Sequence, residues 1–250
     1  MVVELDQHFL EDKELLERIV KVCDINSSDI VFEIGPGKGD LTKVILSKEL
    51  SKLICVEKDV NLKSFLELEI RENPQLEYIV GNGLEELDKH LITKLIANIP
   101  YSITEPLYSK ILDLKLPYCV LLHGNDFYKN IVERETKWKY FINAFYNVEL
   151  IEEVLGSKFS PPTKVKSVFV KLTIKKLVSQ VDVFYQNLWE KRKRYTKNAL
   201  IFALVDTYDL TKSEAEEKVG NMILNNKEEL LQKNLENLSN SEFKEIMDKL

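Results

Sequence analysis

The sequence predicts an α/β fold with a mostly parallel sheet, followed by a small all-α domain. Short apolar runs of strand length alternate with helical segments from Ile30 to about Glu135, and this alternation is typical of parallel sheets. A glycine-rich turn joins the first strand to the following helix, which is the layout of a nucleotide-binding crossover. After about Val178 the chain becomes helical and strongly charged. We therefore divide the chain into domains 1–177 and 178–250.

The spacing of apolar residues predicts each element in turn. A helix is expected over 11–24, where Leu15, Leu16, Ile19 and Val20 recur at helical spacing. Apolar runs predict strands over 30–32, 53–57, 76–80, 94–97, 118–122, 148–155 and 165–174, the last two as an antiparallel pair. Further helices are expected over 41–46 and, in the second domain, near 180–206, 211–224 and 227–250.

Composition limits the class of protein. The chain has 250 residues, 44% of them hydrophobic, which is enough for a sizeable core. No apolar run reaches the ~20 residues of a membrane span, and the N-terminus lacks the layout of a signal peptide. Three cysteines and three histidines show no metal-ligand spacing, so we expect buried thiols, no metal and a reducing cytoplasm. The net charge is −6, so nucleic-acid binding would have to rest on local basic clusters.

The glycine turn runs from Glu33 to Gly39 with the spacing Gly-x-Gly-x-Gly. A dinucleotide fingerprint would need glycine at Asp40, and no Gly-Lys-Ser/Thr follows, which disfavours a diphosphate loop and excludes a P-loop. Gly35 and Gly37 allow the backbone to approach a ligand closely. The carboxylate of Glu33 fits a ligand with a cationic end, such as the amine of S-adenosylmethionine. The alternative is a solvated carboxylate at a strand end.

Two further strand ends carry polar side chains that suit adenosine. Glu57 ends the second strand, where an acid in dinucleotide folds binds the ribose hydroxyls. The neighbouring Lys58 and Asp59 could compete for this position, although Glu57 is best placed. Asn82 follows the third strand and could hydrogen-bond to the adenine edge, with Gly83 beside it. The alternative for this pair is an Asn-Gly turn that uses positive φ.

The sequence Asn-Ile-Pro-Tyr follows the fourth strand at 98–101. The side-chain oxygen of Asn98 and the carbonyl of Ile99 can both accept hydrogen bonds from a planar exocyclic amine, and Tyr101 can stack on the base that carries it. The alternative is a strand end followed by an X-Pro turn. Because ligands of open parallel sheets bind at the carboxyl ends of strands, these strand ends should meet in one crevice.

Together these motifs resemble those of the ribosomal RNA adenine dimethyltransferases and their erythromycin-resistance relatives, over nearly the whole chain. The matching segments are Gln7-His8-Phe9-Leu10, Glu33 to Gly39, Glu57, Gly81-Asn82, Asn98 to Tyr101, and Phe159 to Val165 with Ser167. The resemblance implies a Rossmann-like S-adenosylmethionine-dependent methyltransferase sheet that includes one reversed strand. It also implies S-adenosyl-L-methionine as the cofactor, a catalytic domain over 1–177 and a helical RNA-binding domain over 178–250.

The resemblance also implies roles for individual residues. The catalytic group would be Asn98, Ile99, Pro100, Tyr101 and Phe159, with Phe159 packing against the flipped base. The cofactor would be bound by Gln7, His8, Leu10, Glu33, Gly35, Gly37, Gly39, Glu57, Lys58, Asn82, Gly83 and Asn98. Independently of the resemblance, two clusters of positive charge could bind RNA phosphates: Lys164 with Lys166, and Lys191, Arg192, Lys193, Arg194 and Lys197 on a predicted helix. The alternative for such a basic run is a solvated helix face.

The sequence also departs from the family pattern. His8 stands where the family has Asn, and Asn82 stands where it usually has Asp. The stretch 122–126 lacks the usual Gln-Lys/Arg-Glu pattern, and 137–140 replaces a usual Tyr-Gly/Ser-Arg-Leu run. Asn82 keeps an acceptor oxygen but has no charge, so we expect weaker cofactor binding.

Three functions stay open. They are dimethylation of adjacent adenines in small-subunit rRNA, as part of ribosome biogenesis; methylation of a large-subunit adenine; and a non-catalytic rRNA-binding assembly factor. The basic run before Asn198-Ala199-Leu200 favours the first, Ile99 favours the second, and the changes at His8 and Asn82 favour the third. We expect a monomeric cytoplasmic enzyme that acts on rRNA within a small-subunit particle, without a membrane partner.

Overall fold

The computed structural model describes residues 8–221 and 228–249, apart from the side chain of Tyr101. Contacts within the chain define two compact units. The first consists of Met1–Tyr128 and Val148–Ile174, and the second of Lys129–Asn147 and Lys175–Leu250. The second unit thus includes a segment that precedes the predicted boundary, and the division into domains 1–177 and 178–250 stays a prediction.

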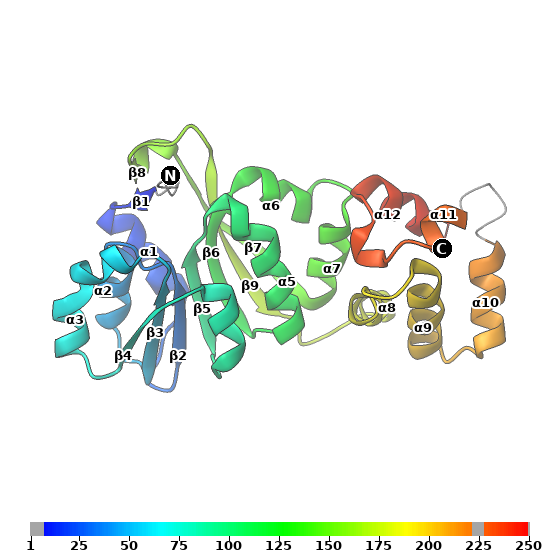
Figure 1. Cartoon of the computed structure of the whole chain (residues 1–250), viewed down its shortest axis with the longest axis horizontal. Coiled ribbons are helices and arrows are strands. Elements are labelled where there is room, and N and C mark those ends of the chain that lie inside the picture. Colours follow the sequence, from blue (N-terminus) through cyan, green and yellow to red (C-terminus); the bar gives the residue numbers. More distant parts are fainter. Residues whose placement is uncertain (1–7, 222–227, 250) are drawn as a thin grey trace. The chain divides into compact units, whose positions relative to one another are not determined.

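The main sheet has seven strands in the order β4-β3-β2-β5-β6-β9-β7 (Figure 1). The strands are β2 (Ile30–Ile34), β3 (Lys52–Glu57), β4 (Leu76–Val80), β5 (Lys94–Asn98), β6 (Tyr118–Gly124), β7 (Tyr146–Val154) and β9 (Ser167–Ile174). Neighbours from β4 to β6 are parallel, and β9 runs antiparallel to β6, which confirms the α/β class and the reversed strand. Because β3 and β5 lie on opposite sides of β2, the chain leaves β2 and β5 at a topological switch point, where a crevice is expected.

Helices α1 (Lys13–Val22) and α2 (Asp40–Leu46) pack on one face of this sheet. The Asp12 carboxylate caps α1 by accepting the Leu15 N–H at 3.0 Å, and α1 then presents its apolar stripe to a core shared with Val31 and Ile96. The other helices in this part of the chain are η1 (Val60–Leu66), α3 (Glu67–Glu72), α4 (Gly83–Glu86), η2 (Leu87–Lys89), η3 (Tyr101–Ile103), α5 (Thr104–Leu114), α6 (Asn125–Val132) and η4 (Gly156–Lys158).

A second, two-stranded sheet joins segments far apart in the sequence. Strand β1 (Phe9–Leu10) pairs antiparallel with β8 (Phe159–Ser160), so that Leu10 lies opposite Phe159 (Figure 1). Both of these side chains are buried in the core that contains α1 and α2. The pairing therefore holds the start of the described chain against the segment that precedes β9.

The second unit is helical and has an aromatic core. Its helices are α7 (Lys137–Phe145), α8 (Gln180–Glu190), α9 (Thr196–Tyr208), α10 (Lys212–Asn221), α11 (Glu228–Leu231), η5 (Leu235–Asn237) and α12 (Asn240–Met247). Phe141 contacts both Trp189 and Phe243, with ring centroids 5.1 and 5.3 Å away. No helix within 8–221 or 228–249 combines the length and the apolar character that crossing a membrane requires.

The single helix predicted near 180–206 is wrong, because a turn over 191–195 separates α8 from α9. Within this turn the Arg194 carbonyl accepts the Leu235 N–H at 3.1 Å, and the Arg192 carbonyl accepts the Glu236 N–H at 3.0 Å. These bonds to a distant segment replace those that a continuous helix would make. The basic run that begins at Lys191 therefore lies mostly on a turn and not on a helix.

Candidate active site

A cavity of about 280 Å³ opens at the carboxyl ends of the central strands in the first unit. The glycine turn after β2 and the ends of β3, β5 and β6 contribute to its wall. Residues of β1, β8 and β9 and of helices α1, α2, η1 and η3 also line it. The predicted convergence of strand ends is thus found for Glu33, Glu57 and Asn98, all of which line this cavity.

The glycine turn has a backbone conformation and close contacts that favour glycine over other residues. Gly35, Gly37 and Gly39 have φ values of +68°, +59° and +86°, a region that residues with a Cβ rarely adopt. A Cβ on Gly37 would lie 2.9 Å from Cε1 of Phe9, and one on Gly39 would lie 2.3 Å from Cδ2 of Leu66. The turn can therefore approach both β1 and a ligand closely.

Glu33 lies inside β2 and is only 1% exposed. Its Oε2 accepts hydrogen bonds from Thr42 Oγ1 at 2.8 Å and from Cys55 Sγ at 3.2 Å. Burial raises the pKa of this carboxyl to about 7, the two hydrogen bonds lower it, and the nearby Glu57 carboxylate raises it. The alternative of a solvated carboxylate at a strand end is wrong.

Glu57 is also buried, at the end of β3. Its Oε2 accepts the Gly37 N–H at 3.1 Å, and its Oε1 accepts the Asp59 N–H at 2.9 Å. The carboxylate thus fixes the glycine turn relative to the next strand. Lys58, the competing candidate, is exposed and does not line the cavity.

Asn82 has a local structural role. Its Oδ1 accepts the Leu84 N–H at 3.1 Å as the N-cap of α4, and its Nδ2 donates to Glu85 Oε1 at 2.8 Å. Asn82 has φ −88° and Gly83 is not among the residues with positive φ, so the positive-φ turn is wrong. Gly83 is required for packing, since a Cβ would lie 2.7 Å from Cγ2 of Ile34. Neither residue lines the cavity, and their cofactor roles stay predictions.

The Asn-Ile-Pro-Tyr segment begins at the last residue of β5 and continues along the cavity wall. Asn98, Ile99 and Pro100 all line the cavity. The Nδ2 of Asn98 donates to the His8 carbonyl at 3.4 Å, and the Ile99 N–H donates to the Leu122 carbonyl at 2.8 Å. The segment is therefore anchored to the residue that precedes β1 and to β6. The side chain of Tyr101 lies outside the described part of the chain.

The β1–β8 pair closes one side of the cavity. His8, Leu10 and Phe159 line it, and His8 Nδ1 is 2.8 Å from the Pro161 carbonyl. Phe159 is 6% exposed, so most of its ring is packed against protein. Gln7 lies outside the described residues.

Sequence reasoning missed His123, which lines the cavity from β6. Its Nδ1 is 3.0 Å from the Gly124 carbonyl and its Nε2 is 2.8 Å from the Tyr108 hydroxyl. A carbonyl only accepts, so Nδ1 donates and Nε2 accepts from Tyr108. Burial lowers the pKa of His123 to about 4, and the ring is neutral. A polar residue at the end of an apolar strand was its only signal in the sequence.

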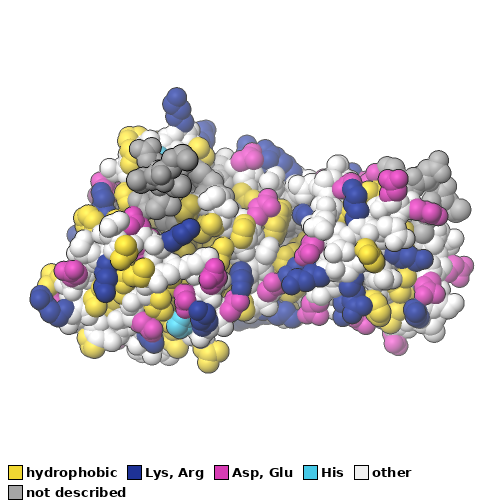
Figure 2. Space-filling model, in the orientation of Figure 1, with side chains coloured by type: hydrophobic (Ala, Val, Ile, Leu, Met, Phe, Trp, Pro, Cys, Tyr) yellow, Lys and Arg dark blue, Asp and Glu magenta, His cyan; other side chains and the backbone are white. Residues whose placement is uncertain are grey.

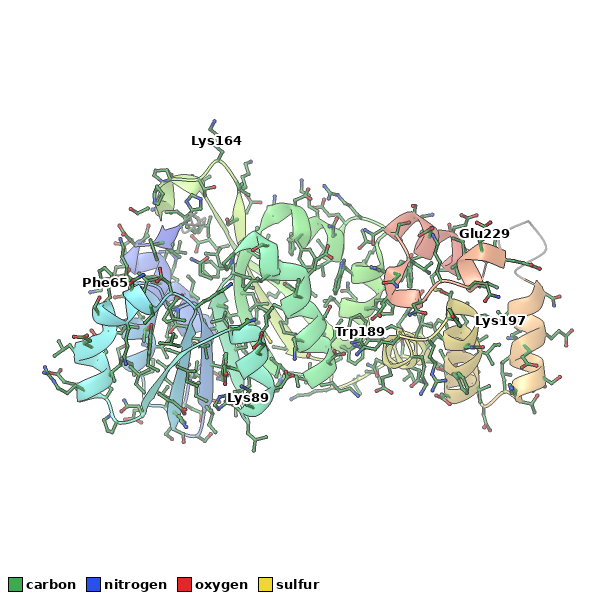
Figure 3. All side chains as sticks on the ribbon, in the orientation of Figure 1. Phe65, Lys89, Lys164, Trp189, Lys197 and Glu229 are labelled. Carbon is green, nitrogen blue, oxygen red and sulfur yellow. The ribbon has the colours of Figure 1, made fainter. Side chains whose placement is uncertain are left out.

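The basic residues predicted to bind RNA differ in exposure. Lys164 and Lys166 are exposed on the loop between β8 and β9, and Lys164 points away from the sheet (Figure 3). In the second unit, Lys191 forms an ion pair with Asp206 at 3.3 Å, and the Arg192 guanidinium lies 4.0 Å from the Trp189 ring centroid. The exposed members of that run are Lys193, Arg194 and Lys197. Over the face shown in Figure 2, acidic and basic side chains are interspersed.

A mostly parallel sheet with a glycine turn, two buried acids and a cavity at its strand ends defines the class: a Rossmann-like methyltransferase. Two solved structures align along nearly the whole chain. A dimethyladenosine transferase from Plasmodium falciparum has a TM-score of 0.64 at 21% identity and covers 97% of both chains. The 23S rRNA methyltransferase ErmE has a TM-score of 0.62 at 17% identity and covers 97% of this chain and 99% of its own. At such identities the likeness establishes the fold.

Sequence comparison establishes the family. The model of the ribosomal RNA adenine dimethylase family matches residues 3–248. A probable ribosomal RNA small subunit methyltransferase A of Methanococcus aeolicus is 36% identical over 210 residues, covering 79% of this chain and 77% of that protein. Its counterpart in Methanopyrus kandleri is 32% identical over 211 residues, covering 80% and 76%. The chain belongs to the ribosomal RNA adenine dimethylase family, whose members are methyltransferases, and this membership implies a methyl donor of the S-adenosylmethionine kind and an rRNA substrate.

Proposed function

We propose that the protein dimethylates the exocyclic amines of two adjacent adenines in small-subunit rRNA, with S-adenosyl-L-methionine as the donor. One observation carries this proposal: Asn98 lines the same cavity as the two buried carboxylates that would hold the donor. The choice of the small subunit rests on the names of the relatives. We also propose that the protein acts in the cytoplasm, as a monomer, on a small-subunit particle.

The cavity fits the methyl donor. Glu33 can face a cationic amine, Glu57 can accept ribose hydroxyls, and the side-chain-free turn leaves backbone for close contact. Apolar walls from Leu41 and Leu62 would cover the rest of the molecule. When bound, S-adenosylmethionine supplies a methyl group that is already electrophilic on its sulfonium.

The residues at 98–101 and Phe159 would hold the acceptor base. The Asn98 side-chain oxygen and the Ile99 carbonyl would accept the N–H bonds of the adenine amine and direct its lone pair toward the methyl group. Such orientation of two reactants is worth on the order of 7–11 kcal/mol. Tyr101 and Phe159 would hold the faces of the base, at roughly 1–3 kcal/mol for each stacked base. No strong general base is required, because the amine loses its proton readily once it is alkylated.

Exposed lysines beside the cavity would bind the RNA backbone. Phe159 and Ser167, at the two ends of the loop that carries Lys164 and Lys166, both line the cavity. Lysines at this position would contact phosphates next to a base held by Phe159. Lys193, Arg194 and Lys197 form a second exposed basic group, on the helical unit, and we propose that it also binds rRNA.

The proposal is tested by incubating small and large ribosomal subunits, in separate reactions, with the pure protein and labelled donor, and then mapping the modified nucleotides by mass analysis. Two adjacent dimethylated adenines in small-subunit rRNA are expected. A modified large-subunit adenine would indicate the second function considered from the sequence. Binding of rRNA without methyl transfer to either subunit would indicate an assembly factor, and either result would contradict the proposal.

Asn98→Ala gives the sharper test. We expect this variant to lose transfer by at least about 100-fold, because the amine is no longer oriented, while it still binds S-adenosylmethionine in calorimetry. Asn147→Ala, which changes an exposed asparagine on β7 outside the cavity, is the matched control. Near-native turnover of Asn98→Ala would remove this residue from the mechanism.

A further inference from the structure

The buried carboxyl of Glu33 is held by the protein at only one of its two oxygens. Thr42 Oγ1 and Cys55 Sγ both donate to Oε2, and within the described residues no group donates to Oε1. Glu33 lines the cavity although it is almost completely buried. The geometry thus leaves one carboxylate oxygen for a ligand in the cavity.

We propose that Thr42 and Cys55 are positioning residues that turn Glu33 so that its Oε1 meets the cationic amine of the methyl donor. This inference rests on the proposed function for the identity of the cation. Thr42 belongs to α2 and Cys55 to β3, so two elements hold the carboxyl from different sides. Cys55 pairs directly with Glu33 in the register of β2 and β3.

The two donors also favour the charged form of the carboxyl. Burial and the carboxylate of Glu57 raise the pKa of Glu33, whereas the bonds from Thr42 and Cys55 lower it. Since that pKa is about 7, loss of a donor moves it above neutral pH and leaves more of the carboxyl protonated. A protonated carboxyl attracts a cation weakly, so donor binding should weaken at neutral pH and recover at higher pH.

The surroundings of Glu33 offer no competing explanation for such a shift. Besides Glu57, the titratable side chains on the cavity wall are His8, Lys38, Asp40 and His123. Lys38 forms an ion pair with Glu11 at 2.9 Å, and none of these four is among the groups that shift the pKa of Glu33. Burial and the adjacent Glu33 carboxylate raise the pKa of the Cys55 thiol well above its ordinary value, so Cys55 keeps its proton and remains a donor.

The test measures binding of S-adenosylmethionine to the full-length protein by calorimetry at pH 7 and pH 9. At pH 7 we expect Cys55→Ala and Thr42→Val each to weaken binding by about three- to tenfold, within the range that one typical intramolecular hydrogen bond contributes. At pH 9 the difference from wild type should narrow, because Glu33 is ionised in every variant. Cys55→Ser, which keeps a donor, should restore binding.

Titration of the Glu33 carboxyl by carbon NMR, in protein without donor, gives a readout independent of binding. Its pKa should rise in Cys55→Ala and Thr42→Val and stay unchanged in Cys119→Ala, a control that alters an equally buried thiol on β6. The signal is assigned by its absence in Glu33→Gln.

Two results separate the inference from the proposed function. If wild-type protein binds no S-adenosylmethionine at either pH, the proposed function fails. If wild type binds but Cys55→Ala and Thr42→Val bind equally well, or are weakened equally at both pH values with Cys55→Ser not restoring binding, the positioning role is wrong and the proposed function stands.

Discussion

Two buried side chains on the cavity wall respond to pH in opposite senses. Burial raises the pKa of Glu33 from 4.5 to about 7 and lowers the pKa of His123 from 6.5 to about 4. Between pH 4.5 and about 7, the Glu33 carboxyl is protonated in the folded protein and ionised in the unfolded chain. Between pH 6.5 and about 4, the His123 ring is neutral in the folded protein and protonated in the unfolded chain. Each difference changes the free energy of unfolding with pH.

For Glu33, the folded-state pKa is raised, so its stabilising contribution is present below pH 4.5 and is lost as pH rises to about 7. We expect Glu33→Gln to be more stable than wild type above pH 7, by on the order of 3 kcal/mol, and the advantage to vanish toward pH 4.5. Urea unfolding of both proteins without ligand, at several pH values, measures this difference in the free energy of unfolding. Glu67→Gln, at an exposed glutamate of α3, corrects for the change in net charge, and a pH-independent difference would contradict the prediction.

For His123, the folded-state pKa is lowered, so its contribution is present above pH 6.5 and is lost as pH falls to about 4. Wild type should lose on the order of 3 kcal/mol from this residue over that window. His123→Gln cannot take up the proton, and we expect its stability to fall less steeply. The same urea series measures both slopes, and identical slopes would show that His123 is not kept neutral by the fold.

At the scale of elements, the glycine turn is the segment in which residue identity most directly determines the backbone of the site. Its three positive-φ glycines lie between β2 and α2, and Glu57 accepts a hydrogen bond from the central one. The sequence predicted this turn correctly because glycine spacing between a strand and a helix is a local signal. Contacts from β1 and η1 leave no room for a Cβ at Gly37 and Gly39.

We predict different costs for alanine at two of these glycines. Gly35 has open space around a Cβ, whereas a Cβ on Gly39 would lie 2.3 Å from a side-chain carbon of Leu66. Gly35→Ala should cost about 1 kcal/mol for its positive φ, and Gly39→Ala about 1–3 kcal/mol more because Leu66 must move. Thermal unfolding of both variants measures the difference, and equal costs would mean that Leu66 adapts freely.

Elements that depend on distant partners were harder to predict. The helix expected near 180–206 is interrupted because backbone groups at 192 and 194 bond to residues 235 and 236. The short β1–β8 pair left no strand signal in the sequence, since each strand has only two residues. In both cases hydrogen bonds between remote segments decide the conformation, and local propensity does not encode them.

At the scale of the whole molecule, a net charge of −6 accompanies an rRNA substrate. The charge distribution accounts for this. Lys191 forms an ion pair with Asp206, and Arg192 contacts both Glu236 and the Trp189 ring. The exposed lysines are Lys164, Lys166, Lys193 and Lys197. RNA affinity should therefore depend on a few exposed lysines and fall steeply with salt.

We expect the double variant Lys164→Ala/Lys166→Ala to bind rRNA more weakly than wild type. The slope of log affinity against log salt concentration should also become shallower, by about 0.7–0.9 for each phosphate that the protein no longer neutralises. Binding of a labelled rRNA fragment over a series of salt concentrations measures the slope. The control removes two lysines that are already in ion pairs, Lys89 with Glu86 and Lys212 with Glu216. A control slope that changes as much as the double variant's would assign the effect to net charge alone.

The sequence by itself determined the sheet, the glycine turn and the meeting of Glu33, Glu57 and Asn98. Parallel strands bring their carboxyl ends to one edge, so residues at strand ends become neighbours wherever they stand in the chain. Only the tertiary structure decided which neighbours the buried polar side chains keep: His123 accepts a hydrogen bond from Tyr108, and Glu33 accepts hydrogen bonds from Thr42 and Cys55. Those partners come from other elements, and their distances depend on packing that no local pattern specifies.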